Sequence, residues 1–195
     1  MTGAEGLLIR QRLAAYGLSV APFRYGTTSD GLTQVLSALS TAIREQGPEV
    51  RLLGHSLGGL IILSCLAEHP ELTVGPVVLM GSPVNGSQAA RGLARIPGAG
   101  WMMGEAAAVE LLGTTQRVWA RGTPLGVIAG DWPLGIGAML AELPSPHDGA
   151  VAVAETQLDG ATDQRVFHVN HLGLLTSVAV AHAAAGFLNS GHFPD

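Results

Sequence analysis

The sequence predicts one α/β domain, in which a mostly parallel sheet carries helices on both faces. Short apolar runs alternate along the chain with longer stretches of helical pattern, which is typical of strand–helix–strand crossovers. Two of these runs, Val50–Leu53 and Pro76–Met80, are almost continuously apolar, as strands are when both of their faces are buried. With 195 residues, 47% of them hydrophobic, the chain is long enough to bury one large core.

Each element is placed from its apolar pattern and from the residues that end it. The expected strands are Leu18–Tyr25, Val50–Leu53, Val74–Met80, Leu125–Ala129 and Arg165–Val169. The expected helices are Ala4–Tyr16, Gly31–Gln46, Leu57–Glu68 and Leu172–Asn189. The irregular segment Gly86–Pro124 contains Trp101 and Trp119. This segment is either a cap over the ligand site or a surface pair of helices with two packed tryptophans.

Composition and charge exclude several classes of function. The net charge is −5 and the ten Lys and Arg residues are scattered, so nucleic acid is not an expected partner. Cys65, the single cysteine, lies in an apolar run; we expect a buried thiol there, with no disulfide and no cysteine-based zinc site. No apolar stretch reaches the roughly 18 residues of a membrane span, and the N-terminus has no signal-peptide pattern. A cytoplasmic protein is expected, and its oligomeric state stays open.

Gly54-His55-Ser56-Leu57-Gly58 fits the G-x-S-x-G pattern, in which a serine stands on a sharp turn between a strand and a helix. Here the pattern follows one expected strand and opens an expected helix. Such a turn holds the serine clear of the sheet, where a histidine can take its proton. We expect both glycines because side chains there would collide with the neighbouring strand and helix. The N–H of Leu57, at the start of the helix, would stabilise a developing oxyanion.

The segment Gly54–Gly59 resembles the nucleophile elbow of bacterial lipases and esterases of the α/β-hydrolase superfamily. Val77–Ser87 resembles the strand and the turn that follow the elbow helix in the same lipases. Val169–Leu172 is similar to their histidine motif, and Asp148-Gly149-Ala150-Val151 to the Asp-Gly-x-Val segment that carries their acid. The resemblance covers nearly the whole chain. It implies a three-layer α/β-hydrolase fold and a triad in the chain order serine, acid, histidine.

This order implies Ser56 as the nucleophile and His171 as the base. Among the seven histidines, His171 stands in a short loop between the last strand and an apolar helix, whereas His168 and His182 lie where packing is expected. The acid that orients the histidine has four candidates, namely Asp131, Asp148, Asp159 and Asp163. The resemblance favours Asp148. Asp131, directly after the strand Leu125–Ala129, occupies the position used in other members of the superfamily and stays the alternative.

One part of the implied fold has no counterpart in the sequence. The first strand of the fold ends in His-Gly, lies beside the nucleophile strand and leads into a loop that donates a second oxyanion N–H. Here Met1 stands just before the helix Ala4–Tyr16, so the sheet lacks this oxyanion-loop strand. We expect that the natural start lies upstream of Met1. A strand supplied by a partner chain and a short form with impaired activity are the alternatives.

These residues predict a serine hydrolase that cleaves a carboxylic ester through an acyl-enzyme, as lipases and esterases do. The expected partner is a small-molecule acyl ester, and no cofactor or metal is needed. Thioesters, amides and acyl transfer stay open because the triad determines the chemistry and not the substrate. The alternative is a non-catalytic or impaired relative whose pocket binds an apolar ligand or a partner, and the missing strand favours it.

Overall fold

Four parallel strands form one sheet among residues 4–26, 30–96, 104–113, 117–135 and 142–194, which the computed structural model describes. In the order of the sheet, the strands are β1 (Leu52–His55), β2 (Val77–Met80), β3 (Leu125–Gly130) and β4 (Asp163–Phe167). The register pairs Leu52 with Val77 and Val77 with Leu125. Four of the five expected strands are therefore present, and the α/β fold class is confirmed.

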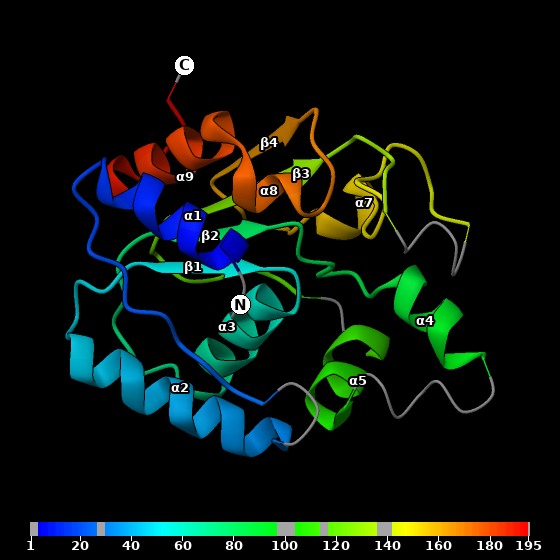
Figure 1. The fold of residues 1–195 in the computed structure, drawn as a ribbon. Helices are drawn as coiled ribbons and strands as arrows, with labels where there is room; N and C mark the ends of the chain where they lie inside the picture. The colour runs from blue at the N-terminus through cyan, green and yellow to red at the C-terminus, as the bar shows by residue number, and fades with distance from the viewer. Residues whose placement is uncertain (1–3, 27–29, 97–103, 114–116, 136–141, 195) are drawn as a thin grey trace.

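Helices cover both faces of this sheet (Figure 1). One face carries α1 (Ala4–Ala14), α8 (Gly173–Thr176) and α9 (Val178–Ser190), and the other carries α2 (Leu32–Gln46) and α3 (Leu57–Glu68). Three shorter helices lie toward the end at which the strands point, namely α4 (Gln88–Ala94), α5 (Gly104–Leu112) and α7 (Val153–Thr156). Within the described residues, no helix combines the length and the apolar character that crossing a bilayer requires.

The apolar residues of β2 divide between two cores, one on each face of the sheet. Val77 and Leu79 pack with α2 and α3, whereas Val78 and Met80 pack with α1, α8 and α9. All four are buried, because successive side chains of a strand point to opposite faces and helices cover both. This arrangement explains why the strand has no alternation of polar and apolar residues.

The expected helix Leu172–Asn189 is in fact two helices, and its prediction as one is wrong. Ser177, between α8 and α9, has an extended backbone (ψ 134°), and its hydroxyl accepts a hydrogen bond from Val180 N–H at 3.4 Å. A serine at this position satisfies an N–H at the start of α9 that has no partner within the helix. The break places α8 directly after His171, at the end of the sheet.

The expected strand Leu18–Tyr25 is also wrong, because the segment is extended but has no strand partner among the described residues. A groove of about 1080 Å³ lies between it and β1, lined by residues 18–25 on one side and residues 49–58 on the other. We call this the β1 groove. A strand needs a neighbouring ladder of backbone hydrogen bonds. The separation from β1 therefore accounts for the missing strand and leaves β1 as an edge of the sheet.

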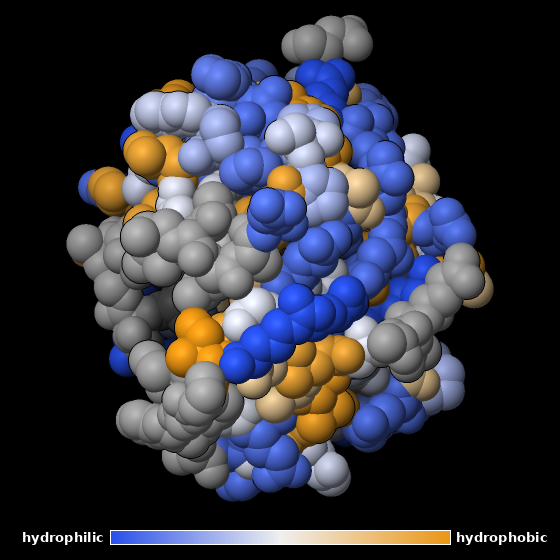
Figure 2. Space-filling view, turned by 90° about the vertical axis from the view of Figure 1, so that its right-hand side faces the viewer, coloured by the Kyte–Doolittle hydropathy of each residue, from blue (hydrophilic) through white to orange (hydrophobic). Residues whose placement is uncertain are grey.

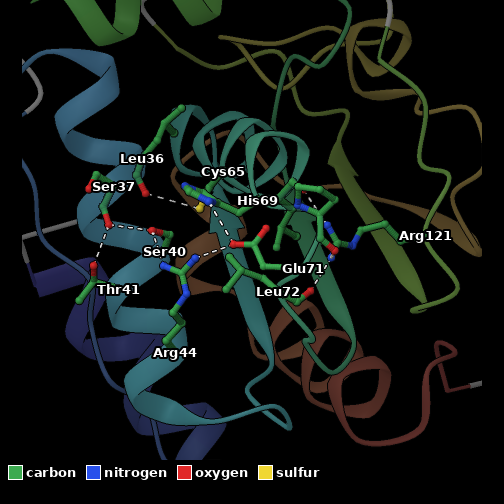
Figure 3. Close-up of polar contacts among 12 residues, drawn as sticks. Leu36, Ser37, Ser40, Thr41, Arg44, Cys65, His69, Glu71, Leu72 and Arg121 are labelled. Atoms are coloured by element: carbon green, nitrogen blue, oxygen red, sulfur yellow. Dashed lines mark hydrogen bonds and ion pairs between the residues drawn. The ribbon is translucent and has the colours of Figure 1, made fainter.

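A polar network joins α2 to the loop after α3, as Figure 3 shows. Arg44 contacts Ser40 on its own helix at 3.1 Å and Glu71 at 2.5 Å, and Glu71 also contacts His69 at 3.3 Å. Cys65 is buried beside this network, with its thiol 3.6 Å from the carbonyl oxygen of Leu36. Burial raises the pKa of this thiol to about 11. The prediction of a buried thiol is confirmed.

In the described part of the segment Gly86–Pro124, the helices α4 and α5 contact each other. Trp119 is buried, and its indole N–H donates to Thr123 C=O at 2.7 Å. Trp101 lies outside the described residues. On α5, the buried Glu110 accepts a hydrogen bond from Ser64 of α3 at 2.5 Å and pairs with Arg117. This contact holds α5 against the helix that begins at Ser56.

Candidate active site

Ser56 stands at the carboxyl end of β1, immediately before α3, with φ 54° and ψ −125°. It is the only residue other than glycine with a positive φ in the described part of the chain. Such a conformation is strained and persists where surrounding contacts enforce it. Here Ser56 N–H donates to Met80 C=O at 2.9 Å, and Ser56 C=O accepts from Gly59 N–H at 3.1 Å. The sharp strand-to-helix turn is present at the predicted serine.

Two glycines allow β1 and α3 to approach each other at this turn, and one of them is not the predicted one. A Cβ on Gly54 would lie 2.5 Å from Gly59 Cα, and a Cβ on Gly59 would lie 2.1 Å from Ser82 Oγ. At Gly58, by contrast, nothing lies within 4 Å of the position of a Cβ. The expected collision at Gly54 is confirmed. The expected collision at Gly58 is wrong, because Gly58 faces open space and Gly59 packs against the turn after β2.

Asp148 is buried and pairs with the partly buried His171. Asp148 Oδ2 lies 2.7 Å from His171 Nδ1, and the two side chains are 1% and 17% exposed. Asp148 Oδ1 accepts two further hydrogen bonds, from Ala150 N–H at 2.9 Å and from Val151 N–H at 2.7 Å. Gly149 (φ 90°) makes this tight turn possible. The Asp-Gly-x-Val pattern is therefore a loop that folds around its own carboxylate and aims the second oxygen at the histidine.

The loop that carries His171 is also held by its backbone. His171 N–H donates to Asp148 C=O at 2.9 Å, and Asn170 Oδ1 accepts from Gly173 N–H at 2.7 Å. The imidazole also lies beside Gly81, the residue after β2, where an added Cβ would come 3.1 Å from Nδ1. These contacts bring His171 to the same end of the sheet as Ser56.

His55 provides the contact between the Ser56 turn and the His171 loop. The centroids of the two imidazole rings are 4.6 Å apart, and His55 Nε2 lies 3.0 Å from His171 C=O. The structure records no hydrogen bond between Ser56 Oγ and the ring of His171, although both residues are described. Ser56, Asp148 and His171 thus lie at one end of the sheet, and His55 contacts the loop that carries His171.

Asp131, the alternative acid, has a different partner. Its Oδ1 lies 2.9 Å from His168 Nδ1, and the two side chains are 34% and 78% exposed. The expected packing of His168 is wrong, because this residue lies beyond the end of β4 and only the ring of Trp132 stacks on it, at 6.2 Å. His182 is exposed as well. Asp159 and Asp163 lie before and at the first residue of β4, at the end of the strand remote from His171.

Sequence reasoning missed Glu155, a buried carboxylate near the site. Its side-chain oxygens accept hydrogen bonds from Gln88 N–H at 2.7 Å and from Ala152 N–H at 2.9 Å. Burial raises the pKa of this carboxyl above its ordinary value. Glu155 connects the loop after β2 with the Asp148 loop. The only signal in the sequence is a Glu three residues after the start of a short helix, which is typical of any helix N-terminus.

Figure 2 looks onto the end of the molecule toward which the strands point, with an apolar area in its lower half below a band of hydrophilic residues. The β1 groove reaches this end at Ser56 and Leu57. As the first residue of α3, Leu57 has an N–H with no partner inside the helix. No cluster of His, Cys, Asp or Glu suited to a metal ion occurs among the residues that the structure describes.

Comparison with solved structures shows what this arrangement is similar to. Bacillus licheniformis lipase BlEst2 in its mature form aligns with a TM-score of 0.64 and 22% identity, over 84% of this chain and 76% of the lipase. The metagenomic carboxyl esterase MGS0156 aligns with a TM-score of 0.66 and 18% identity, over 94% of this chain and 67% of the esterase. The chain has the α/β-hydrolase fold.

A third protein with this fold, the pyrethroid hydrolase PytH, aligns with a TM-score of 0.63 and 15% identity, over 96% of this chain and 93% of the hydrolase. No family model and no curated protein matches the sequence. The α/β-hydrolase fold that the sequence motifs implied is confirmed. At these identities the likeness concerns the fold, so the chemistry has to be argued from the residues of this chain.

Proposed function

We propose that this protein is a serine hydrolase that cleaves a carboxylic ester, with Ser56, Asp148 and His171 as its catalytic triad. The observation that carries the proposal is the contact of the buried Asp148 with His171, at 2.7 Å, at the same end of the sheet as the strained Ser56. A buried carboxylate that bonds Nδ1 leaves the other ring nitrogen to act on a hydroxyl. The neighbouring lipase and esterase folds support the same class of reaction.

The proposed reaction has two steps. Ser56 Oγ attacks the carbonyl carbon of the ester while His171 Nε2 takes the hydroxyl proton, and the Leu57 N–H donates to the oxyanion that develops. Collapse of the tetrahedral species breaks the bond to the alcohol, which leaves with the proton from His171. Water then attacks the acyl-enzyme, His171 takes a proton from this water, and the acid departs as Ser56 recovers its proton.

A small-molecule ester with an apolar acyl group is the substrate class that we propose. Ser56 and Leu57 line the end of the β1 groove, and we propose that the acyl group binds at this end, beyond the edge Leu52–His55 beside which a further strand would lie. We also propose that α4 and α5 act as a cap, because they lie at the end of the sheet that carries Ser56. Apolar side chains around a few polar groups are typical of small-molecule sites.

A second candidate function is binding without catalysis, as in a non-catalytic or impaired relative that holds an apolar ligand or a partner. The observation that favours it is the open edge of β1, where a further strand and its oxyanion N–H would lie. The pairing of Asp148 with His171 opposes it, since a binding protein has no need of an oriented base.

A fluorophosphonate probe separates the two functions, because it reacts only with an activated serine. We expect labelling of Ser56 in the native chain, and loss of both labelling and ester turnover by several orders of magnitude in Ser56→Ala. Ser37→Ala is a suitable control, because Ser37 is an exposed serine on α2. Turnover by Ser56→Ala at the native rate, on a series of p-nitrophenyl esters, would exclude the serine-hydrolase proposal.

A further inference from the structure

His55 is the last residue of β1 and directly precedes Ser56, yet its side chain contacts the loop of His171. Its Nε2 lies 3.0 Å from the carbonyl oxygen of His171, and the centroids of the two rings lie 4.6 Å apart, with the rings tilted by 43°. A carbonyl oxygen can only accept. Nε2 must therefore carry a proton and donate it, and Nδ1 of the neutral ring is then unprotonated.

We propose that His55 is a positioning residue, whose Nε2–H binds the carbonyl of His171 and places the base beside Ser56. The inference rests on the proposed hydrolase function and adds to it a residue that does not touch the reacting atoms. Two hydrogen bonds fix His171 to the Asp148 loop, one from its N–H at 2.9 Å and one from its Nδ1 at 2.7 Å. Among the described residues, only the bond from His55 ties the peptide of His171 to β1, the strand that precedes Ser56.

The charge of His55 suits this role. Burial, and to a smaller degree the nearby ring of His171, lower the pKa of His55 to about 3. His55 is therefore neutral over the whole range in which a histidine base works. A neutral neighbour does not repel the imidazolium that forms on His171 when it takes the proton of Ser56. A lysine or arginine at position 55 would oppose this charge.

Packing is the ordinary reason for a histidine at the end of a strand. Two substitutions of His55 distinguish a packing role from a positioning role. Glutamine carries an amide nitrogen at about the same reach as Nε2, so His55→Gln retains a donor for the carbonyl of His171. His55→Leu has a similar apolar bulk and no donor. His182→Leu is the control, because His182 is an exposed histidine on α9.

The first measurement reports the position of the His171 loop and does not depend on catalytic activity. Amide hydrogen exchange of His171, whose N–H bonds Asp148 C=O, reports how firmly the loop is held. We expect exchange at His171 to become at least tenfold faster in His55→Leu and to stay near the native rate in His55→Gln. Equal exchange in the native chain and both variants would overturn the proposal, even if the hydrolase function is correct.

The second readout is the reaction itself, measured on variants that melt as cooperatively as the native chain. We expect kcat to fall about tenfold in His55→Leu with KM nearly unchanged, which is the order of one neutral hydrogen bond, and His55→Gln to recover most of the loss. Equal losses in His55→Leu and His55→Gln would show that the hydrogen bond is not responsible and would overturn the proposal. If the native chain neither labels with fluorophosphonate nor turns over esters, the proposed function fails, and the exchange experiment still decides whether His55 positions His171.

Discussion

The backbone of Ser56, with φ 54° and ψ −125°, departs from what a serine adopts in a free chain. Conformations of this kind cost on the order of 1–3 kcal/mol and are kept where surrounding structure over-determines them. At Ser56 the constraint comes from both sides, since its N–H is bonded to β2 and its C=O to the first turn of α3. A residue in this conformation projects its side chain from the end of the sheet.

The assignment of the acid is testable at the scale of single residues. We expect Asp148→Asn to lower kcat by up to about 10⁴-fold, because an amide at this position favours the wrong tautomer of the histidine. Asp131→Asn should change kcat little, since Asp131 contacts His168 and not His171. Steady-state kinetics of the two variants on one ester provide the comparison. A larger loss in Asp131→Asn would move the acid to that position.

At the scale of elements, the turn depends on how closely α3 approaches β1 and β2. Gly59, in the first turn of α3, lies against Ser82 of the turn after β2, whose hydroxyl is buried with no hydrogen-bond partner among the described residues. At Gly54 the backbones of β1 and α3 approach each other directly, and at Gly59 the backbone of α3 approaches the side chain of Ser82. Because Ser56 lies between Gly54 and Gly59 in the chain, a change in the packing at either glycine also changes the conformation of Ser56.

The two glycines of α3 form a matched pair for a stability measurement. Gly59→Ala should lower the free energy of unfolding by about 1–3 kcal/mol, because its Cβ has no room and forces neighbouring atoms to move. Gly58→Ala should raise it by up to about 1 kcal/mol, since nothing lies near its Cβ and alanine loses less backbone entropy in a helix. Urea unfolding of both variants measures the difference. Similar urea midpoints for Gly59→Ala and Gly58→Ala would contradict the close contact between Gly59 and Ser82.

At the scale of the whole molecule, the three layers are complete except at the edge of β1. Leu52 and Ser56 direct their N–H groups to β2, so the alternating residues Leu53 and His55 direct theirs toward the β1 groove, as parallel pairing requires. On the far side of the groove, Val20 packs with one core and Phe23 and Tyr25 with the other. Beside β1, therefore, no strand of the described residues separates the core on one face of the sheet from the core on the other face.

We expect this chain to be more soluble and more active when a designed N-terminal extension pairs as a strand beside β1, because β1 is an edge of the sheet among the described residues. Each unpaired buried backbone group costs about 1–3 kcal/mol, against a total stability of about 5–15 kcal/mol. The loss of one oxyanion donor lowers kcat by about 10²–10³-fold. Light scattering and the rate of fluorophosphonate labelling compare the two lengths. A short chain that is monomeric, cooperatively folded and as active as the extended one would contradict this expectation.

Much of the fold and of the site could be predicted, because the relevant signals are local. The helix Leu57–Glu68 was predicted with the bounds that the structure has, since the turn that starts it and the proline that follows it lie within a few residues of its ends. The Asp-Gly-x-Val loop is also local, as Asp148 bonds the backbone of its own next residues. The split at Ser177 was missed because an apolar pattern continues across it.

The sequence by itself determined the fold class, the strained serine turn and the residues that can serve as base and acid, because each depends on the order of residues within one segment. Tertiary structure alone decided four other features. Asp148, and not Asp131, contacts His171, and Gly59, rather than Gly58, is the glycine in close contact with Ser82. Leu18–Tyr25 has no strand partner among the described residues, and His55 bonds the His171 loop. The physical reason is common to all four. Each is a contact, or a missing contact, between segments far apart in the chain, and distances between such segments depend on how all the layers pack together.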